Sequence, residues 1–182
     1  MTSIVHLALA LKKFSPRYLQ VAGFAVVACV LAAAQSLPQV HLDAAGLAPR
    51  PIEELTGTTI ARHYALAWRD MAGALESGRS EVLSEEFTGV AKDRLVRRIS
   101  EQNQAGVHVR IVDHGHQLKA VFYSRDGSAM QLVDQAQLEI QIFDGNKLID
   151  TQNASQEYMV LMTPGADRWY VRDLEEVSAK TF

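Results

Sequence analysis

The sequence has a single cysteine, Cys29, among its 182 residues. One thiol cannot form an internal disulfide, so cysteine usage does not indicate the redox compartment of the protein. The chain also lacks a glycine-rich phosphate loop, and no set of Ser, His and Asp residues can be assembled into a nucleophilic triad. We therefore expect no cofactor.

The net charge changes sign along the chain, from positive in the N-terminal quarter to negative in the remainder. Residues 1–49 carry three basic residues and one acidic residue, a net charge of +2, whereas the remainder carries 15 basic and 20 acidic residues, a net charge of −5. An acidic domain repels a phosphate backbone. Nucleic acid is therefore not an expected partner.

One long apolar run is present, from Tyr18 to Leu37, and it contains no charged residue. Its length suits a helix that spans the hydrocarbon core of a bilayer. Three basic residues precede the run, and the first charge after it is acidic, at Asp43. The positive-inside rule then predicts a short cytoplasmic segment at 1–17, a transmembrane helix at 18–37 and an extracytoplasmic remainder. In a bacterium this is a single-pass protein of the inner membrane with a periplasmic domain.

Two processing alternatives exist for this run. The small residues at Ala32–Ala34 are typical of a signal-peptidase site, and the sequence that ends at Cys29 resembles a lipobox with a lipidated cysteine. The apolar run continues through Leu37 with no polar stretch after Cys29, which favours an uncleaved anchor. The proline-containing stretch at 38–54 then predicts an extended linker before a domain at 55–182.

Three helices are predicted at the start of this domain. The first begins at Thr56 or Thr58 and ends near Ser77, a short helix or turn covers 80–87, and a third helix begins after Thr88 and ends near Gly106. In the third helix, Val90, Ala91, Leu95 and Ile99 are expected to point inward. The first helix carries an apolar stripe at three- and four-residue spacing: Ile60, Tyr64, Trp68, Met71 and Leu75.

After Gly106 the period changes to the alternation of β-strands. Strands are predicted at 107–111 and 118–123, with a turn at His114-Gly115-His116 between them. A long hairpin over 129–162 reverses near Gly145, and a last strand covers 168–174. Helices followed by a mostly antiparallel sheet define the α+β class.

Three helices followed by a strongly curved meander, with the phrase Asp167-Arg168-Trp169-Tyr170-Val171 on the final strand, resemble the nuclear transport factor 2-like (SnoaL-like) superfamily over about residues 55–178. The phrases at 86–89 and 136–139 are similar to its membrane-anchored, non-catalytic branch. That branch includes the intermembrane-space domains of plastid and cyanobacterial division proteins, the Mce-associated proteins and the periplasmic scaffold subunit of type IV secretion. The resemblance implies a cone-shaped domain of three helices packed on the curved sheet.

The resemblance also defines an enzymatic alternative. Enzymes of this superfamily use an Asp or His base in an apolar cone, and Asp134 is the lone charge on the apolar face of the long strand. The same aspartate could instead lie near a strand end, reaching solvent or pairing with an arginine. No catalytic dyad accompanies it, so we expect no catalysis, with an isomerase- or cyclase-like enzyme or a small-ligand binder as the alternative. The expected cavity comprises Asp134, Tyr64, Trp68, Tyr158 and Trp169, with His63 and Gln156 nearby.

Two further groups have a simple structural interpretation. His114 and His116 have ligand-type side chains, but they lie on a predicted turn without the three or four ligands that zinc sites use, so no metal is expected. A basic ridge at Lys92, Arg94, Arg97 and Arg98 is interpreted as an exposed helix face, with an acidic partner or a lipid headgroup as the alternative.

The leading hypothesis is a membrane-anchored accessory or scaffold subunit that mediates protein–protein assembly in a membrane complex. Polar side chains on the other face of the long strand are expected to contact other membrane-complex subunits, or to form a homo-oligomer through the sheet. These side chains are Gln131, Gln135, Gln137, Glu139 and Gln141.

Overall fold

The computed structural model describes residues 37–177. The predicted cytoplasmic segment, Cys29 and the predicted transmembrane helix, apart from Leu37, lie outside the described residues. Within 37–177, no helix is both long enough and apolar enough to cross a membrane.

The first helix, α2 (Glu54–Ser77), begins two residues earlier than the first of the two predicted starts. The Thr58 and Thr59 hydroxyls donate to the carbonyls of Glu54 and Leu55 one turn back, so neither acts as an N-cap. The helix ends at Gly78, whose φ of 69° is left-handed. The predicted apolar stripe is buried in full.

The second predicted helix is a short 3-10 helix, η2 (Glu81–Glu85), so the domain has two α-helices rather than three. Thr88 is the N-cap of α3 (Gly89–Ala105), as predicted. The buried residues of α3 are Ala91, Leu95, Ile99 and Gln102. Val90 was expected to point inward but is 47% exposed, because it precedes this stripe by one residue and lies on the flank of the helix.

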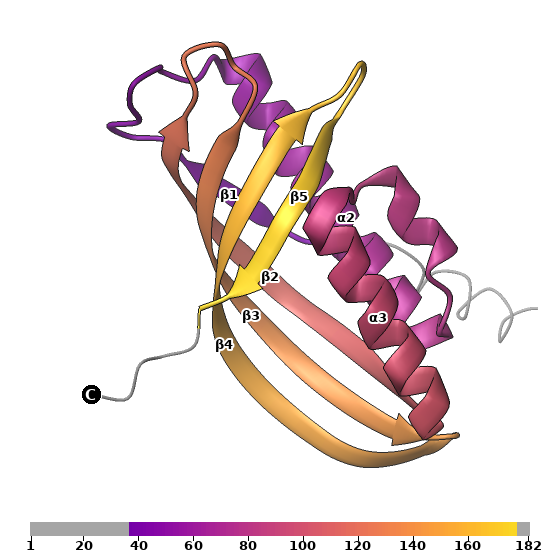
Figure 1. Cartoon of the computed structure of the whole chain (residues 1–182). Coiled ribbons are helices and arrows are strands. Elements are labelled where there is room, and N and C mark those ends of the chain that lie inside the picture. The colour runs from indigo at the N-terminus through magenta and orange to yellow at the C-terminus, as the bar shows by residue number, and fades with distance from the viewer. Residues whose placement is uncertain (1–36, 178–182) are drawn as a thin grey trace, which may run out of the picture. The chain divides into compact units, whose positions relative to one another are not determined.

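Five strands form one sheet in the order β1-β2-β3-β4-β5. The strands are β1 (Val40–Asp43), β2 (Val107–Tyr123), β3 (Met130–Asp144), β4 (Lys147–Pro164) and β5 (Trp169–Glu176). Only the β1–β2 pair is parallel, so the sheet is mostly antiparallel and the α+β class is confirmed. Both α-helices lie on the same concave side of the sheet (Figure 1).

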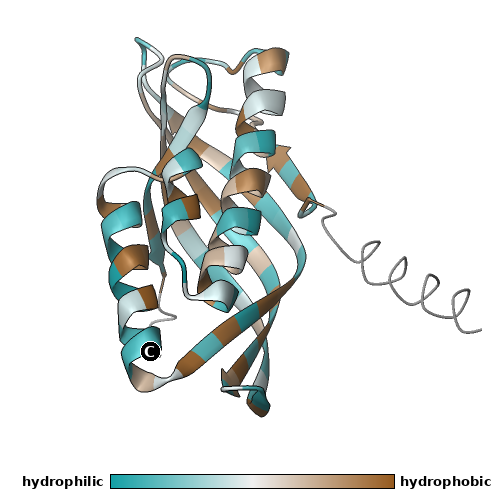
Figure 2. Cartoon of the chain, turned by 90° about the vertical axis from the view of Figure 1, so that its right-hand side faces the viewer, coloured by the Kyte–Doolittle hydropathy of each residue, from teal (hydrophilic) through white to brown (hydrophobic). Residues whose placement is uncertain are grey.

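The predicted turn at His114-Gly115-His116 is wrong. Residues 107–123 form one continuous strand, and the pairing with β3 shifts register between Asp113 and Gly115. Gly115 adopts a φ of 124°, which a bulge accommodates without reversing the chain. The bulge moves the buried side chains from odd positions such as Val109 to even positions such as His116 and Leu118. Bands of polar and apolar residues alternate along the strands (Figure 2).

The segment predicted as a linker contains a strand. β1 pairs in parallel with β2, from Val40 beside His116 to Asp43 beside Lys119. Its four residues alternate between half-buried and exposed, a pattern too short to be recognised in the sequence. β1 covers part of the β2 edge that would otherwise be open.

The core lies between the concave face of the sheet and the two α-helices. The even positions of β3 are buried as predicted, from Met130 to Leu138. They meet the stripe of α2 in one cluster. Its largest fully buried side chains include Trp68, Tyr64, Ile60, Leu75, Leu118, Met130, Leu132 and Met162.

Candidate functional site

Asp134 lies in a buried polar network that joins α2, β2 and β3. Its side chain is 0% exposed. Oδ2 accepts a hydrogen bond from the Tyr64 hydroxyl and lies opposite Nδ1 of His116, each at 2.8 Å. Nε2 of His116 lies 2.8 Å from Oδ2 of Asp113, near the surface. The expectation that Asp134 reaches solvent or pairs with an arginine is therefore wrong, because the bulge in β2 turns His116 inward to meet it.

Electrostatics favour a charged His116. Burial alone lowers the pKa of an imidazole, but the hydrogen bonds and charges of Asp113 and Asp134 outweigh this effect and raise the pKa of His116 to about 9. Both ring nitrogens then donate to carboxylates. Burial, followed by the charge of Asp134, raises the pKa of Tyr64 well above its usual value, so its hydroxyl remains a donor.

Trp68 lies between this network and the cavity enclosed by the α-helices and the sheet, whereas His116 also lines a depression at the β2 bulge. The Trp68 ring centroid lies 4.5 Å from that of His116, and its other side lines the cavity. Asp134, Tyr64 and His116 do not line that cavity. A catalytic base must come within hydrogen-bond reach of its substrate. Asp134 has no such access, and the network is suited to holding α2 against the sheet.

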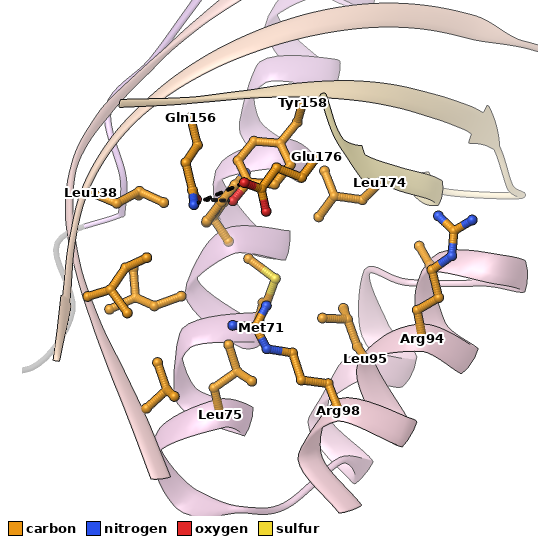
Figure 3. A pocket seen from close by; sticks show the side chains of 15 residues that line it. Met71, Leu75, Arg94, Leu95, Arg98, Leu138, Gln156, Tyr158, Leu174 and Glu176 are labelled. Atoms are coloured by element: carbon orange, nitrogen blue, oxygen red, sulfur yellow. Dashed lines mark hydrogen bonds between the residues drawn. The ribbon is translucent and has the colours of Figure 1, made fainter. Parts of the chain in front are cut away.

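The cavity has a volume of about 210 Å³ and lies between the two α-helices and strands β2 to β5. Its walls are largely apolar, with Met71 and Leu75 from α2, Leu95 from α3, and Leu138 from β3 (Figure 3). A pocket with such walls and a few convergent polar groups is suited to an apolar group that carries one polar end.

The polar groups of the cavity form two sets on opposite sides. On the sheet side, the Tyr158 hydroxyl donates to Gln156, whose amide nitrogen lies 3.4 Å from Oε1 of Glu176. Burial, then the charge of Glu176, raises the pKa of Tyr158 to about 12. On the helix side, Arg94 forms an ion pair of 2.9 Å with Asp173.

Arg98 is the second cation of the cavity. Its side chain extends from α3 into the space, toward Met71 (Figure 3). Its charge partly offsets the raised pKa of Tyr158, which agrees with this direction. Within residues 37–177, Arg98 takes part in none of the ion pairs that the side chains form. The cavity therefore offers a guanidinium that is free to meet an anion.

The convex face of the sheet carries the predicted partner-binding residues. No helix of the described part of the chain covers this face (Figure 1). The amide nitrogen of Gln135 donates to Glu157, and that of Gln137 donates to Ser155. The remaining three, Gln131, Glu139 and Gln141, are half-buried. Exposed Val121 and Phe122 lie at one end of β2, each 42% exposed.

The structure brings together only part of the predicted cavity set. Trp68 and Tyr158 line the cavity with Gln156, whereas Asp134 and Tyr64 lie behind Trp68. Trp169 is in the core beside Tyr123.

Sequence reasoning missed two features. His63 and Glu86 form a nearly buried pair at 2.9 Å, with no motif to indicate it. His114 is exposed while His116 is buried, and the bulge that separates them was not recognised. Within residues 37–177, no three His, Cys, Asp or Glu side chains are grouped to hold a metal ion.

No protein-family model and no curated protein matches the sequence. Among solved structures, the fold is similar to the intermembrane space region of the chloroplast protein ARC6, with a TM-score of 0.60, 16% identity, and coverage of 72% of this chain and 100% of that chain. A protein of Streptomyces avermitilis, assigned to the NTF2-like family as a dehydratase, has a TM-score of 0.44, 13% identity and coverage of 67% and 99%. At these identities only the fold is shared. The described domain therefore has the fold of the ARC6 intermembrane space region.

Proposed function

We propose that this protein is a single-pass, membrane-anchored accessory or scaffold subunit. Its domain assembles with other membrane-complex subunits on the periplasmic side of the bacterial inner membrane. The observation that carries the proposal is the convex sheet face, which no helix of residues 37–177 covers and which presents amides with the exposed Val121 and Phe122 at its end. Such a mixed polar and apolar surface is typical of interfaces between subunits.

Two other observations support assembly over catalysis. Asp134, the residue best placed in the sequence for acid–base chemistry, is sealed behind Trp68. A depression of about 410 Å³ lies at the β2 bulge, lined by Gln137 together with His41 and His114. It gives the convex face a shaped region that a partner can contact. The similarity to ARC6 supports the fold on which the proposal rests.

The test is purification of the full-length chain from native membranes in mild detergent, followed by mass spectrometry. We expect membrane proteins to co-purify in stoichiometric amounts. Gln137→Arg combined with Gln141→Arg should abolish this association while circular dichroism stays unchanged. Lys119→Gln, on the convex face of the neighbouring strand β2, is a control that should retain the association. A protein that purifies alone would contradict the proposal.

The cavity supports a second candidate, binding of a small molecule. Its apolar walls and the free Arg98 guanidinium suit a compact molecule that carries both an apolar group and a carboxylate. Native mass spectrometry of the purified chain tests this candidate. A bound small acid that Arg98→Ala releases would support it, and a mass equal to that of the protein alone after gentle desalting would oppose it.

A further inference from the structure

Within residues 37–177, the outer edge of β4 is open over half its length. β4 pairs with β5 only from Tyr158 to Pro164, whereas residues 147–156 pair with β3 alone. An open edge is a template for another strand, and proteins commonly protect it with lysine, proline or a covering segment. Between Thr151 and Gln156 there is no charged residue and no proline.

The neighbouring strands show which residues of this edge direct their backbone N–H and C=O groups outward. The Val177 N–H donates to the Glu157 carbonyl at 2.8 Å, so residue 157 directs its backbone groups toward the β5 side. Pairing with β3 runs without a register shift from 150 to 162, so Asn153 and Ser155 point the same way. The Thr151 N–H is already satisfied by the Asp150 carboxylate at 2.9 Å. Asn153 and Ser155 thus present their N–H and C=O groups to a strand.

A strand added at this edge would place alternate side chains over the cavity. Ala154 pairs with Leu138, and Gln156 with Ala136, so the even positions of β4 share the face on which the cavity lies. Leu174 and Glu176 of β5 line the same cavity from the adjoining part of that edge. Side chains of the added strand opposite Ala154 and Gln156 would therefore point between the sheet and α3, toward Leu95 and Arg98.

We propose that the β4 edge and the cavity together form one docking site for an extended segment of a partner protein, with a large apolar residue in the cavity and an acidic residue two positions away that pairs with Arg98. This inference rests on the proposed assembly function and names the chemistry of the partner. Main-chain hydrogen bonds to Asn153 and Ser155 would hold the segment as an added strand, and the cavity would select which side chains the segment carries.

The cavity decides against a second copy of this chain as the occupant. In a two-fold pairing of two β4 edges, the side chains that face the cavity would come from the even positions around Gln152 and Ala154. Asp150, on the same face, would supply a carboxylate for Arg98, but neither the amide of Gln152 nor the methyl group of Ala154 fills an apolar space of about 210 Å³. A partner segment with a leucine and a glutamate on one face satisfies both.

The test titrates the full-length chain in detergent with a labelled peptide, Thr-Val-Thr-Glu-Thr-Leu-Thr-Val-Thr, and follows fluorescence anisotropy. Binding should weaken at least tenfold when the amides of the two threonines that flank the leucine are N-methylated, because in an antiparallel pairing with the leucine opposite Ala154 they face Asn153 and Ser155. Methylation of the glutamate and leucine amides, which face solvent, should change affinity less than threefold. Loss of binding on both methylations alike, or no binding by the unmodified peptide, would overturn the inference.

Variants of the protein separate the edge from the cavity. Asn153→Pro removes an outward N–H at an edge position that tolerates proline, and should weaken binding tenfold, whereas Asn153→Ala should not. Arg98→Ala should weaken binding of the glutamate peptide about tenfold and leave binding of a glutamine version unchanged. Octanoate that binds through Arg98, while the peptide binds regardless of Asn153→Pro, would assign the cavity to a small molecule and overturn the inference.

Failure of this inference is distinguishable from failure of the proposed function. If subunits still co-purify with the Asn153→Pro chain, the scaffold function stands and the β4 edge is not the docking site. If sedimentation shows a dimer, and Asn153→Pro dissociates it, the strand that pairs with the β4 edge is that of a second copy of this chain. Peptide binding with the expected pattern, by a chain that purifies alone, would support the docking site and reject stable assembly.

Discussion

His116 is a buried imidazolium held between two carboxylates. A charged group in a protein interior is stable only when it is paired, and here Asp134 on one side and Asp113 on the other provide the pairing. The Trp68 ring at 4.5 Å adds a favourable contact with the cation. Because the Tyr64 hydroxyl also donates to Asp134, the network couples α2 to the strand that carries the bulge.

The charge on His116 predicts a dependence of stability on pH. The folded-state pKa of about 9 lies above the value of 6.5 for a free imidazole. The pairing therefore contributes in full below pH 6.5 and is lost as the pH rises through 9. We expect the free energy of unfolding to fall by about 3 kcal/mol over this range. Urea titrations followed by tryptophan fluorescence measure the change.

A matched variant identifies the group responsible. His116→Gln keeps a polar side chain but cannot be charged, so its free energy of unfolding should be lower at pH 6 and nearly flat between pH 6.5 and 9. His114→Gln, two residues away and exposed, should retain the wild-type slope. An equal slope in the wild type and in His116→Gln would show that other groups carry the pH dependence.

At the scale of single residues, the sequence predicted positions better than partners. The even face of β3 was recognised from its alternation, and Asp134 was correctly identified as its lone charge. Its partner, His116, was not identified, because the bulge changes which positions of β2 face inward. Arg98 is exposed, as the interpretation of the basic ridge predicted, but helix periodicity alone does not show that its long side chain also lines a cavity.

Among the elements, β2 depends most on one residue. Gly115 has a φ of 124°, a conformation that residues with a Cβ rarely adopt. A Cβ there would contact only the Gln39 carbonyl oxygen at 3.5 Å, an ordinary distance, so backbone strain is the main cost. Gly115→Ala should lower the free energy of unfolding by about 1–3 kcal/mol, as measured by urea titration.

Gly73 provides the control for this variant. It lies on the exposed side of α2, and a Cβ there would meet nothing within 4 Å. Gly73→Ala should therefore raise the free energy of unfolding by about 0.5–1 kcal/mol. Similar effects of the two alanines would contradict the assignment of Gly115 as the residue that shapes the bulge.

The elements also show where sequence patterns stop being informative. Long periodic segments such as α2, α3 and the β3–β4 hairpin were predicted with small errors at their ends. β1 and the bulge were missed because the first is four residues long and the second interrupts the period by one residue. Both features are fixed by pairing between distant strands, which local sequence does not encode.

At the scale of the whole molecule, the domain uses its sheet for two purposes. The concave face packs on the helices around the sealed network and the cavity, while the convex face and the β4 edge stay open to contacts. The proposed anchor would place both surfaces on one side of a bilayer together with other membrane-complex subunits. The proposed function therefore predicts that the domain is extracytoplasmic.

This topology can be tested by labelling single cysteines. In a Cys29→Ser background, Ser84→Cys places a thiol on the exposed side of η2, outside the proposed docking surfaces, and Thr2→Cys places one in the predicted cytoplasmic segment. A membrane-impermeant maleimide added to intact spheroplasts should label Ser84→Cys and should label Thr2→Cys only after the membrane is broken, because the basic N-terminal flank stays inside. Intact-mass analysis of the wild type should show an uncleaved, unmodified chain. A mature N-terminus at Gln35 would show that the domain is released, and a diacylated Cys29 would show that a lipid holds it, so either result would contradict the helical anchor. Labelling of Thr2→Cys in intact spheroplasts would contradict the predicted orientation.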